Sequence, residues 1–66
     1  MDYRKAYVGD LIMYQGNTCA NTVTNGETYE VVEVVPYKPL HFFIISDGGV
    51  RKLCKMGFMF AKIGGT

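Results

Sequence analysis

The stretch Glu27–Val35, ETYEVVEVV, decides the fold expected for this chain. Tyr29 and Val31 alternate with Glu30, as in a strand with one buried face, and the alternation is then lost in the second half of the stretch. A long strand that changes its buried face partway contains a bulge or sharp bend and belongs to two sheets in turn. We therefore expect Glu27–Val35 to be the corner strand of a small β-barrel.

Four further strands are expected on either side of this corner strand, from short runs of apolar or alternating residues. Asp47-Gly48 between two such runs predicts a tight hairpin. The four strands are expected at Leu11–Tyr14, Leu40–Ile45, Val50–Leu53 and Met59–Ile63.

The connections between these strands are predicted from turn residues such as Asn, Gly and Pro. They are a long irregular loop over residues 15–26, a loop over 36–39, a hairpin turn at 46–49, a short helical turn around Gly57, and a flexible tail at 64–66.

Both prolines of the chain, Pro36 and Pro39, lie in VPYKPL, with the P-x-x-P spacing that polyproline ligands use. A polyproline helix needs a longer run than two prolines among valines and phenylalanines. Proline also lacks the amide proton that a sheet ladder requires, so we place both prolines in the connection, with Tyr37 and Lys38 at its exposed tip.

Size and composition indicate one small globular domain over residues 1–66. The chain is 48% hydrophobic with a formal charge of +1, and a domain of this size buries only about 60% of the surface that its unfolded form exposes. Its apolar runs are far shorter than the roughly 20 residues of a membrane span. The N-terminal MDYRKAYVGD has no apolar segment, so we expect a cytoplasmic location and two reduced cysteines, Cys19 and Cys54.

The order of these elements is that of an SH3-like barrel. The chain resembles, over nearly its whole length, the small SH3-like proteins that bacteriophages and prophages encode. The residues that carry the resemblance are VGD at Val8–Asp10, NGETYEVVEV at Asn25–Val34, FFIISDGG at Phe42–Gly49, and Gly57-Phe58.

The resemblance implies a five-stranded SH3-like barrel and an early-expressed accessory or host-modulating protein. It does not imply the polyproline binding of signalling SH3 domains, because the aromatic groove motif is missing and the chain has no Trp. The core residues that it implies are Leu11, Tyr29, Val31, Phe42, Ile44, Val50 and Phe58.

Candidate catalytic and metal-binding residues are few. His41 is the only histidine, and no local signature brings it to Cys19 or Cys54 as an acid-base or nucleophile pair. The same three residues lack the Cys-x-x-Cys spacing of zinc sites. SDGGVRK is followed by a strand pattern and not by the helix of a phosphate loop. We therefore expect no enzyme, no cofactor, no metal site and no small-molecule substrate.

The C-terminal third carries the features that favour a binding role. It is basic, with Arg51, Lys52, Lys55 and Lys62 and no acidic residue. Such cations either bind nucleic-acid backbone beside aromatic side chains or protect a solvated edge strand from unwanted pairing. This part of the chain is also richer in large apolar residues than one face of a tiny barrel buries.

The apolar excess is either exposed for a partner or buried between the barrel and its own loops. We expect a protein-binding module, with a host protein as partner or a second copy of the chain. The alternatives are a nucleic-acid-binding barrel and a structural or accessory subunit of a phage particle; no membrane partner is expected. The predicted partner-binding residues are Tyr37, Phe43, Arg51, Lys52, Lys55, Met56 and Met59.

Overall fold

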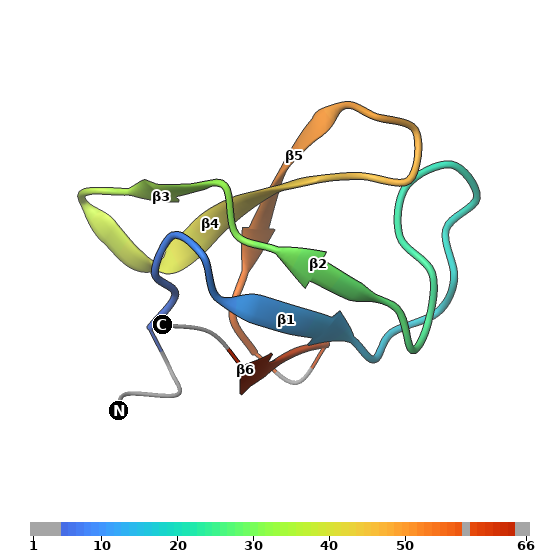
Figure 1. Cartoon of the computed structure of the whole chain (residues 1–66), viewed down its shortest axis with the longest axis horizontal. Coiled ribbons are helices and arrows are strands. Elements are labelled where there is room, and N and C mark those ends of the chain that lie inside the picture. The colour runs from blue at the N-terminus through green and yellow to red at the C-terminus, as the bar shows by residue number, and fades with distance from the viewer. Residues whose placement is uncertain (1–4, 58, 65–66) are drawn as a thin grey trace.

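The computed structural model describes residues 5–57 and 59–64 and shows an all-β chain (Figure 1). The all-β class is therefore confirmed. The described residues form six strands and no helix, whereas the sequence predicts five strands and one helical turn. The strands are β1 Leu11–Tyr14, β2 Thr28–Glu30, β3 Glu33–Val35, β4 Lys38–Ile45, β5 Arg51–Lys55 and β6 Phe60–Gly64.

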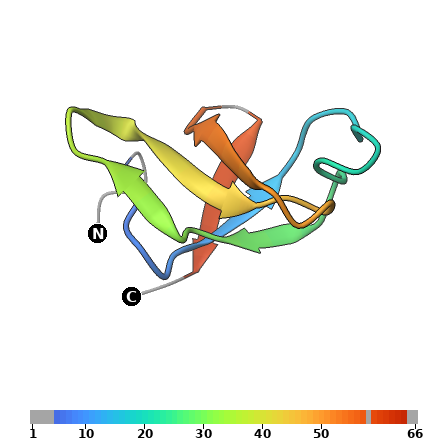
Figure 2. The same ribbon diagram turned by 90° about the horizontal axis from the view of Figure 1, so that it is seen from above.

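The strands form two antiparallel sheets of three strands each, in the orders β2-β1-β6 and β3-β4-β5. Figure 2 shows the two sheets packed across one another. Strands β5 and β6 each end their sheet, and among the described residues their ends are connected only by an isolated bridge between Gly57 and Phe60. The described strands therefore do not close into a barrel.

The predicted corner strand belongs to both sheets, as its pattern indicates. Its first half is β2, paired with β1, and its second half is β3, paired with β4. The change of sheet occurs at two adjacent residues. Val31 N–H donates to the Asp10 carbonyl at 2.9 Å, and Val32 N–H donates to the Phe43 carbonyl at 2.9 Å. This break divides one predicted strand into two and accounts for the count of six.

The turn between β3 and β4 is shorter than predicted, because β3 ends at Val35 and β4 begins at Lys38. The predicted loop over 36–39 is therefore wrong at its end, and Pro39 lies within β4. The β3–β4 register shifts at this end, and the β4–β5 ladder begins only at His41. Proline is tolerated there because neither β3 nor β5 has a regular ladder position that requires an amide proton from residue 39.

Two further predicted connections lie near the C-terminus. The turn predicted around Gly57 includes Phe58, which lies outside the described residues, and Phe60 N–H donates to the Gly57 carbonyl at 3.1 Å. Gly64 is the last residue of β6 and not part of a tail, and residues 65 and 66 of the predicted tail lie outside the described part.

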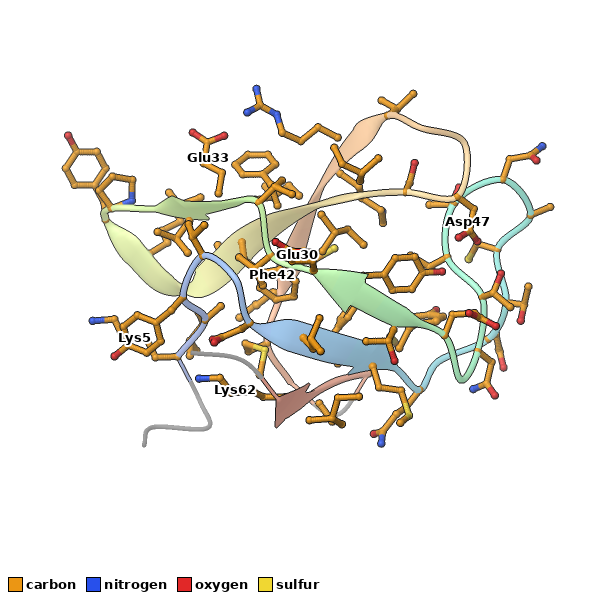
Figure 3. The ribbon with its side chains drawn as sticks, in the orientation of Figure 1. Lys5, Glu30, Glu33, Phe42, Asp47 and Lys62 are labelled. Carbon is orange, nitrogen blue, oxygen red and sulfur yellow. The ribbon has the colours of Figure 1, made fainter. Side chains whose placement is uncertain are left out.

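The core lies between the two sheets, where Figure 3 shows Phe42. The predicted core residues Tyr29, Val31, Phe42 and Ile44 are buried. Leu11 and Val50 are not, with 40% and 68% of their surfaces exposed, and Phe58 lies outside the described residues. The other buried apolar residues are Ala6, Ile12, Tyr14, Val23, Cys54, Met56 and Phe60.

The errors at Leu11 and Val50 have local causes. In β1 the buried face carries Ile12 and Tyr14, so the neighbouring Leu11 faces outward. Val50 precedes β5 and closes the hairpin, with its carbonyl accepting from Ser46 N–H at 2.9 Å. Its side chain therefore lies outside the part of the sheet that packs against the core.

The predicted loop over residues 15–26 is ordered by its own hydrogen bonds. Cys19 N–H donates to the Val23 carbonyl at 2.7 Å, and Val23 is buried in the core. Asp47 of the β4–β5 turn accepts from the Thr24 hydroxyl at 2.7 Å and from the Tyr29 hydroxyl at 2.9 Å. The loop and the turn therefore lie side by side at one end of the molecule (Figures 1 and 2).

A buried ion pair joins the first turn to the last strand. Asp10 Oδ2 lies 2.9 Å from Lys62 Nζ, and both side chains are almost fully buried. The same carboxylate oxygen accepts from Tyr7 N–H at 2.8 Å, while Lys62 Nζ donates to the Lys5 carbonyl at 3.2 Å. The turn before Asp10 depends on Gly9, whose φ of 95° is a conformation that glycine adopts without strain.

Candidate protein-binding surface

The β4–β5 hairpin places the predicted binding residues on two different faces. Paired residues of an antiparallel ladder share a face, and successive residues alternate. Phe43 pairs with Leu53, so Arg51 and Lys55 share the outer face of the sheet with Phe43. Lys52 lies on the opposite side, together with the buried Cys54. The sequence-predicted site is therefore divided by strand alternation.

An apolar strip runs across the outer face of the β3-β4-β5 sheet. Ile45 and Leu53 are 47% and 51% exposed, and Phe43 lies half-buried between Glu33 of β3 and Leu53 of β5. The strip is bordered by charged side chains, and Figure 3 shows Glu33 pointing away from the molecule. We call this surface the outer face; it consists of Glu33, His41, Phe43, Ile45, Arg51, Leu53 and Lys55.

Arg51 is held in place on this outer face by two contacts. Its guanidinium forms an ion pair with Glu33 of β3 and lies 5.0 Å from the centre of the Phe43 ring. Both charged side chains are more than half exposed, so the ion pair contributes at most about 1 kcal/mol to stability. Its main consequence is that a carboxylate offsets the Arg51 charge.

A groove of about 490 Å³ lies along β5 and the turn that follows it. It is lined by Lys52–Lys55 and by Met56, Gly57, Met59 and Phe60. Met56 is buried at its base, which corrects its assignment as an exposed contact residue, whereas Met59 is 47% exposed. Burial raises the pKa of the Cys54 thiol, and the charge of Lys52 acts in the opposite direction.

Tyr37 is separate from both of these features. It lies at the turn between β3 and β4 with 91% of its surface exposed, and it is not part of any strand. The predicted set thus divides into a surface group of Phe43, Arg51 and Lys55, a groove group of Lys52, Met56 and Met59, and an isolated Tyr37; Lys55 also lines the groove.

Leu53 and Glu33 were missed as surface residues by sequence reasoning. The hairpin register about Asp47–Gly49 predicts the position of Leu53, because counting outward from the turn places it opposite Phe43. No local signal identifies Glu33, since it is brought to Arg51 across β4 by the β3–β4 pairing.

The remaining chemically versatile side chains do not converge. His41 lies half-buried opposite Lys55, Cys54 is buried, and Cys19 is exposed in the 15–26 loop as a free thiol. Among residues 5–57 and 59–64, no three His, Cys, Asp or Glu side chains are grouped as metal ligands. The same residues include no helix that could cross a membrane.

Comparison with protein-family models, with curated proteins and with solved structures finds no match to this chain.

Proposed function

We propose that this protein is a non-enzymatic protein-binding module, an open SH3-like barrel that binds its partner through the outer face of the β3-β4-β5 sheet. One observation carries the proposal: the half-buried Phe43 and the exposed Ile45 and Leu53 form an apolar strip on adjacent strands. Protein interfaces combine an apolar centre containing aromatic residues with a charged rim. The Arg51–Glu33 pair and Lys55 supply such a rim.

The partner that we propose is a host protein in the bacterial cytoplasm. The resemblance to small phage-encoded SH3-like proteins supports this choice, because such accessory proteins act on factors of the host. The paired strands β4 and β5 present the apolar strip in a defined conformation, which limits the loss of conformational entropy when any protein partner binds.

Nucleic-acid binding is less well supported. Phosphate recognition depends on cations that are available to the backbone, and Glu33 already offsets the charge of Arg51. Strand alternation also places Lys52 and Lys55 on opposite faces of β5. A single basic track therefore does not form along this strand.

The test compares two serine substitutions at equally exposed apolar residues. Leu53 on the outer face and Ile63 on β6 are both 51% exposed, so Leu53→Ser and Ile63→Ser remove similar apolar area from different surfaces. Tagged wild type and both variants are used to capture proteins from bacterial lysate with and without nuclease treatment. We expect one stoichiometric partner with wild type and Ile63→Ser, and at least about tenfold less with Leu53→Ser.

Circular dichroism of both variants is the control for folding. Equal capture by the two folded variants would contradict the outer face as the binding surface. Capture that disappears on nuclease treatment, and falls steeply as salt is raised, would replace the proposal with nucleic-acid binding.

A further inference from the structure

The outer edge of β5 has no neighbouring strand among the described residues. β5 ends the β3-β4-β5 order, and its ladder partner is β4 alone. An exposed strand edge presents unpaired N–H and C=O groups to which another strand can bind.

The alternation of hydrogen bonds between β4 and β5 identifies these groups. Ser46 N–H donates to the Val50 carbonyl, and Met56 N–H donates to the Leu40 carbonyl, at 2.9 and 2.8 Å. Hydrogen-bonded and non-hydrogen-bonded pairs alternate along an antiparallel ladder. Even-numbered residues of β5 therefore bond to β4, and the N–H and C=O groups of Arg51, Leu53 and Lys55 point to the outer edge.

The hydrogen bonds on the β3 side of β4 follow the same alternation. The Phe43 carbonyl accepts from Val32 N–H on the β3 side, as expected for an odd-numbered residue whose main-chain groups point away from β5.

The groove adjoins the same edge. A strand added to β5 would alternate its side chains between the outer face and the opposite side of the sheet. On that opposite side the groove is lined by Lys52 and Cys54, and its lining continues to the buried Met56 and Phe60 and the exposed Met59. Alternate side chains of an added strand would therefore need to be apolar.

The charges along β5 determine which strand fits. The strand carries Arg51, Lys52 and Lys55 and no acidic residue. Lys52 and Lys55 form no ion pair with the described residues. If β5 of a second copy paired antiparallel about Leu53, Arg51 would lie opposite Lys55 of that copy, and like charges directly opposite destabilise a sheet. A segment with acidic residues avoids this repulsion.

We propose that β5 binds an extended acidic segment of the partner as a fourth strand of the β3-β4-β5 sheet. Glu or Asp side chains of the segment face Lys55 and the Arg51–Glu33 pair on the outer face. The intervening apolar side chains enter the groove over Met56 and Phe60. This inference rests on the proposed protein-binding function and specifies the partner's chemistry and its mode of binding.

The test uses two synthetic peptides, one alternating Val and Glu and the other alternating Val and Lys. Binding to the full chain is followed by fluorescence anisotropy. We expect the Glu peptide to bind at least about tenfold more tightly, because its carboxylates lie beside Lys55 and the Arg51 guanidinium, where the Lys peptide would place like charges.

Amide hydrogen exchange then distinguishes strand addition from side-chain docking. With the Glu peptide at saturation, exchange at Arg51, Leu53 and Lys55 should slow by at least about tenfold, because their N–H groups become hydrogen-bonded. A ligand that contacts only the outer-face side chains would not protect this alternating set.

Two variants at one position separate the lost charge from the lost hydrogen bond. Lys55→Ala removes the charge and keeps the N–H, whereas Lys55→Pro removes both at an edge position that does not bond to β4. We expect Lys55→Pro to bind the Glu peptide at least about tenfold more weakly than Lys55→Ala. Thermal unfolding of both variants verifies that the hairpin is intact.

The outcomes separate this inference from the proposed function. Failure of the Glu peptide to bind, equal binding of the Lys peptide, or binding without amide protection would each overturn strand addition. So would concentration-dependent protection of the same amides without peptide, which would identify a second copy as the occupant. Loss of capture by Leu53→Ser but not by Ile63→Ser would still support the outer face in those cases.

Discussion

Lys62 and Asp10 show how one residue pair joins distant parts of a small chain. Their charged atoms lie 2.9 Å apart inside the molecule, where an unpaired charge would be very unfavourable. The pair connects the turn at Val8–Asp10 to β6. Lys62 was predicted only as part of a basic segment, and its burial removes it from the charge available to a partner.

The variant Lys62→Met tests this contribution. It keeps most of the length of the side chain but leaves the Asp10 carboxylate buried without its ammonium partner. We expect the free energy of unfolding to fall by about 3–5 kcal/mol, a large part of the roughly 3–10 kcal/mol available to a chain of this size. Urea denaturation, or loss of the folded circular dichroism signal, measures the change.

Arg51→Met is the matched control, because it removes the cation of the exposed pair with Glu33. We expect that substitution to change stability by at most about 1 kcal/mol. Equal effects of the two substitutions would show that burial does not distinguish the two ion pairs.

At the scale of elements, the 15–26 loop and the β4–β5 turn stabilise each other. Asp47 accepts hydrogen bonds from the loop and from β2, and its own N–H donates to the Thr22 carbonyl at 2.8 Å. The close approach requires glycine at position 48, since a Cβ there would lie 2.8 Å from the Asn21 carbonyl oxygen. The turn that presents β5 is therefore supported by the loop.

Gly48→Ala tests this packing. The added methyl group would meet a backbone oxygen that is fixed by the loop, so we expect a loss of about 1–3 kcal/mol from the free energy of unfolding. Gly57→Ala is the control, because nothing lies within 4 Å of its Cβ position. If Gly48→Ala is as stable as Gly57→Ala in urea denaturation, the loop does not pack on the turn in solution.

At the scale of the whole molecule, two buried tyrosines link stability to alkaline pH. Burial raises the pKa of Tyr14, and a contact with Cys19 adds to the effect. Burial also raises the pKa of Tyr29; the Thr24 N–H that its hydroxyl accepts lowers the pKa, and Asp47 raises it further. The folded state therefore holds the two phenol protons more tightly than the unfolded chain does.

We expect these two phenols to make their full contribution to the free energy of unfolding below about pH 10, the tyrosine pKa in the unfolded chain. The contribution should be lost as the pH rises through the higher pKa values of the folded state. Tyr29→Phe should lose about 1–3 kcal/mol near neutral pH, because Asp47 and the Thr24 N–H lose their partner. Above pH about 10 its stability should fall less steeply than that of wild type. Urea denaturation at several pH values measures both; parallel curves would contradict the assignment.

Much of the fold was predictable because its signals are local. The alternation of ETYEVVEVV and its loss indicate a strand that changes sheets, and Asp47-Gly48 indicates the hairpin. The loop over 15–26 contains no regular strand or helix, as predicted, but its packing was not predictable, because Val23 enters the core and Thr24 bonds to a distant turn. Such contacts leave no periodic signal in the sequence.

The proposed binding surface was only partly predictable for the same reason. Phe43, Arg51 and Lys55 were identified from composition, and the hairpin register brings them to one face. Met56 was misplaced because its exposure depends on how the chain turns towards β6.

The sequence by itself determined the all-β class, the sheet change within Glu27–Val35 and the basic character of β5, because propensity, alternation and charge are properties of neighbouring residues. Only the tertiary structure decided that the two sheets stay unclosed between β5 and β6, that Lys62 is buried against Asp10, and that Glu33 meets Arg51. These features depend on which strands become neighbours, and that choice follows from packing the whole chain around one shared core.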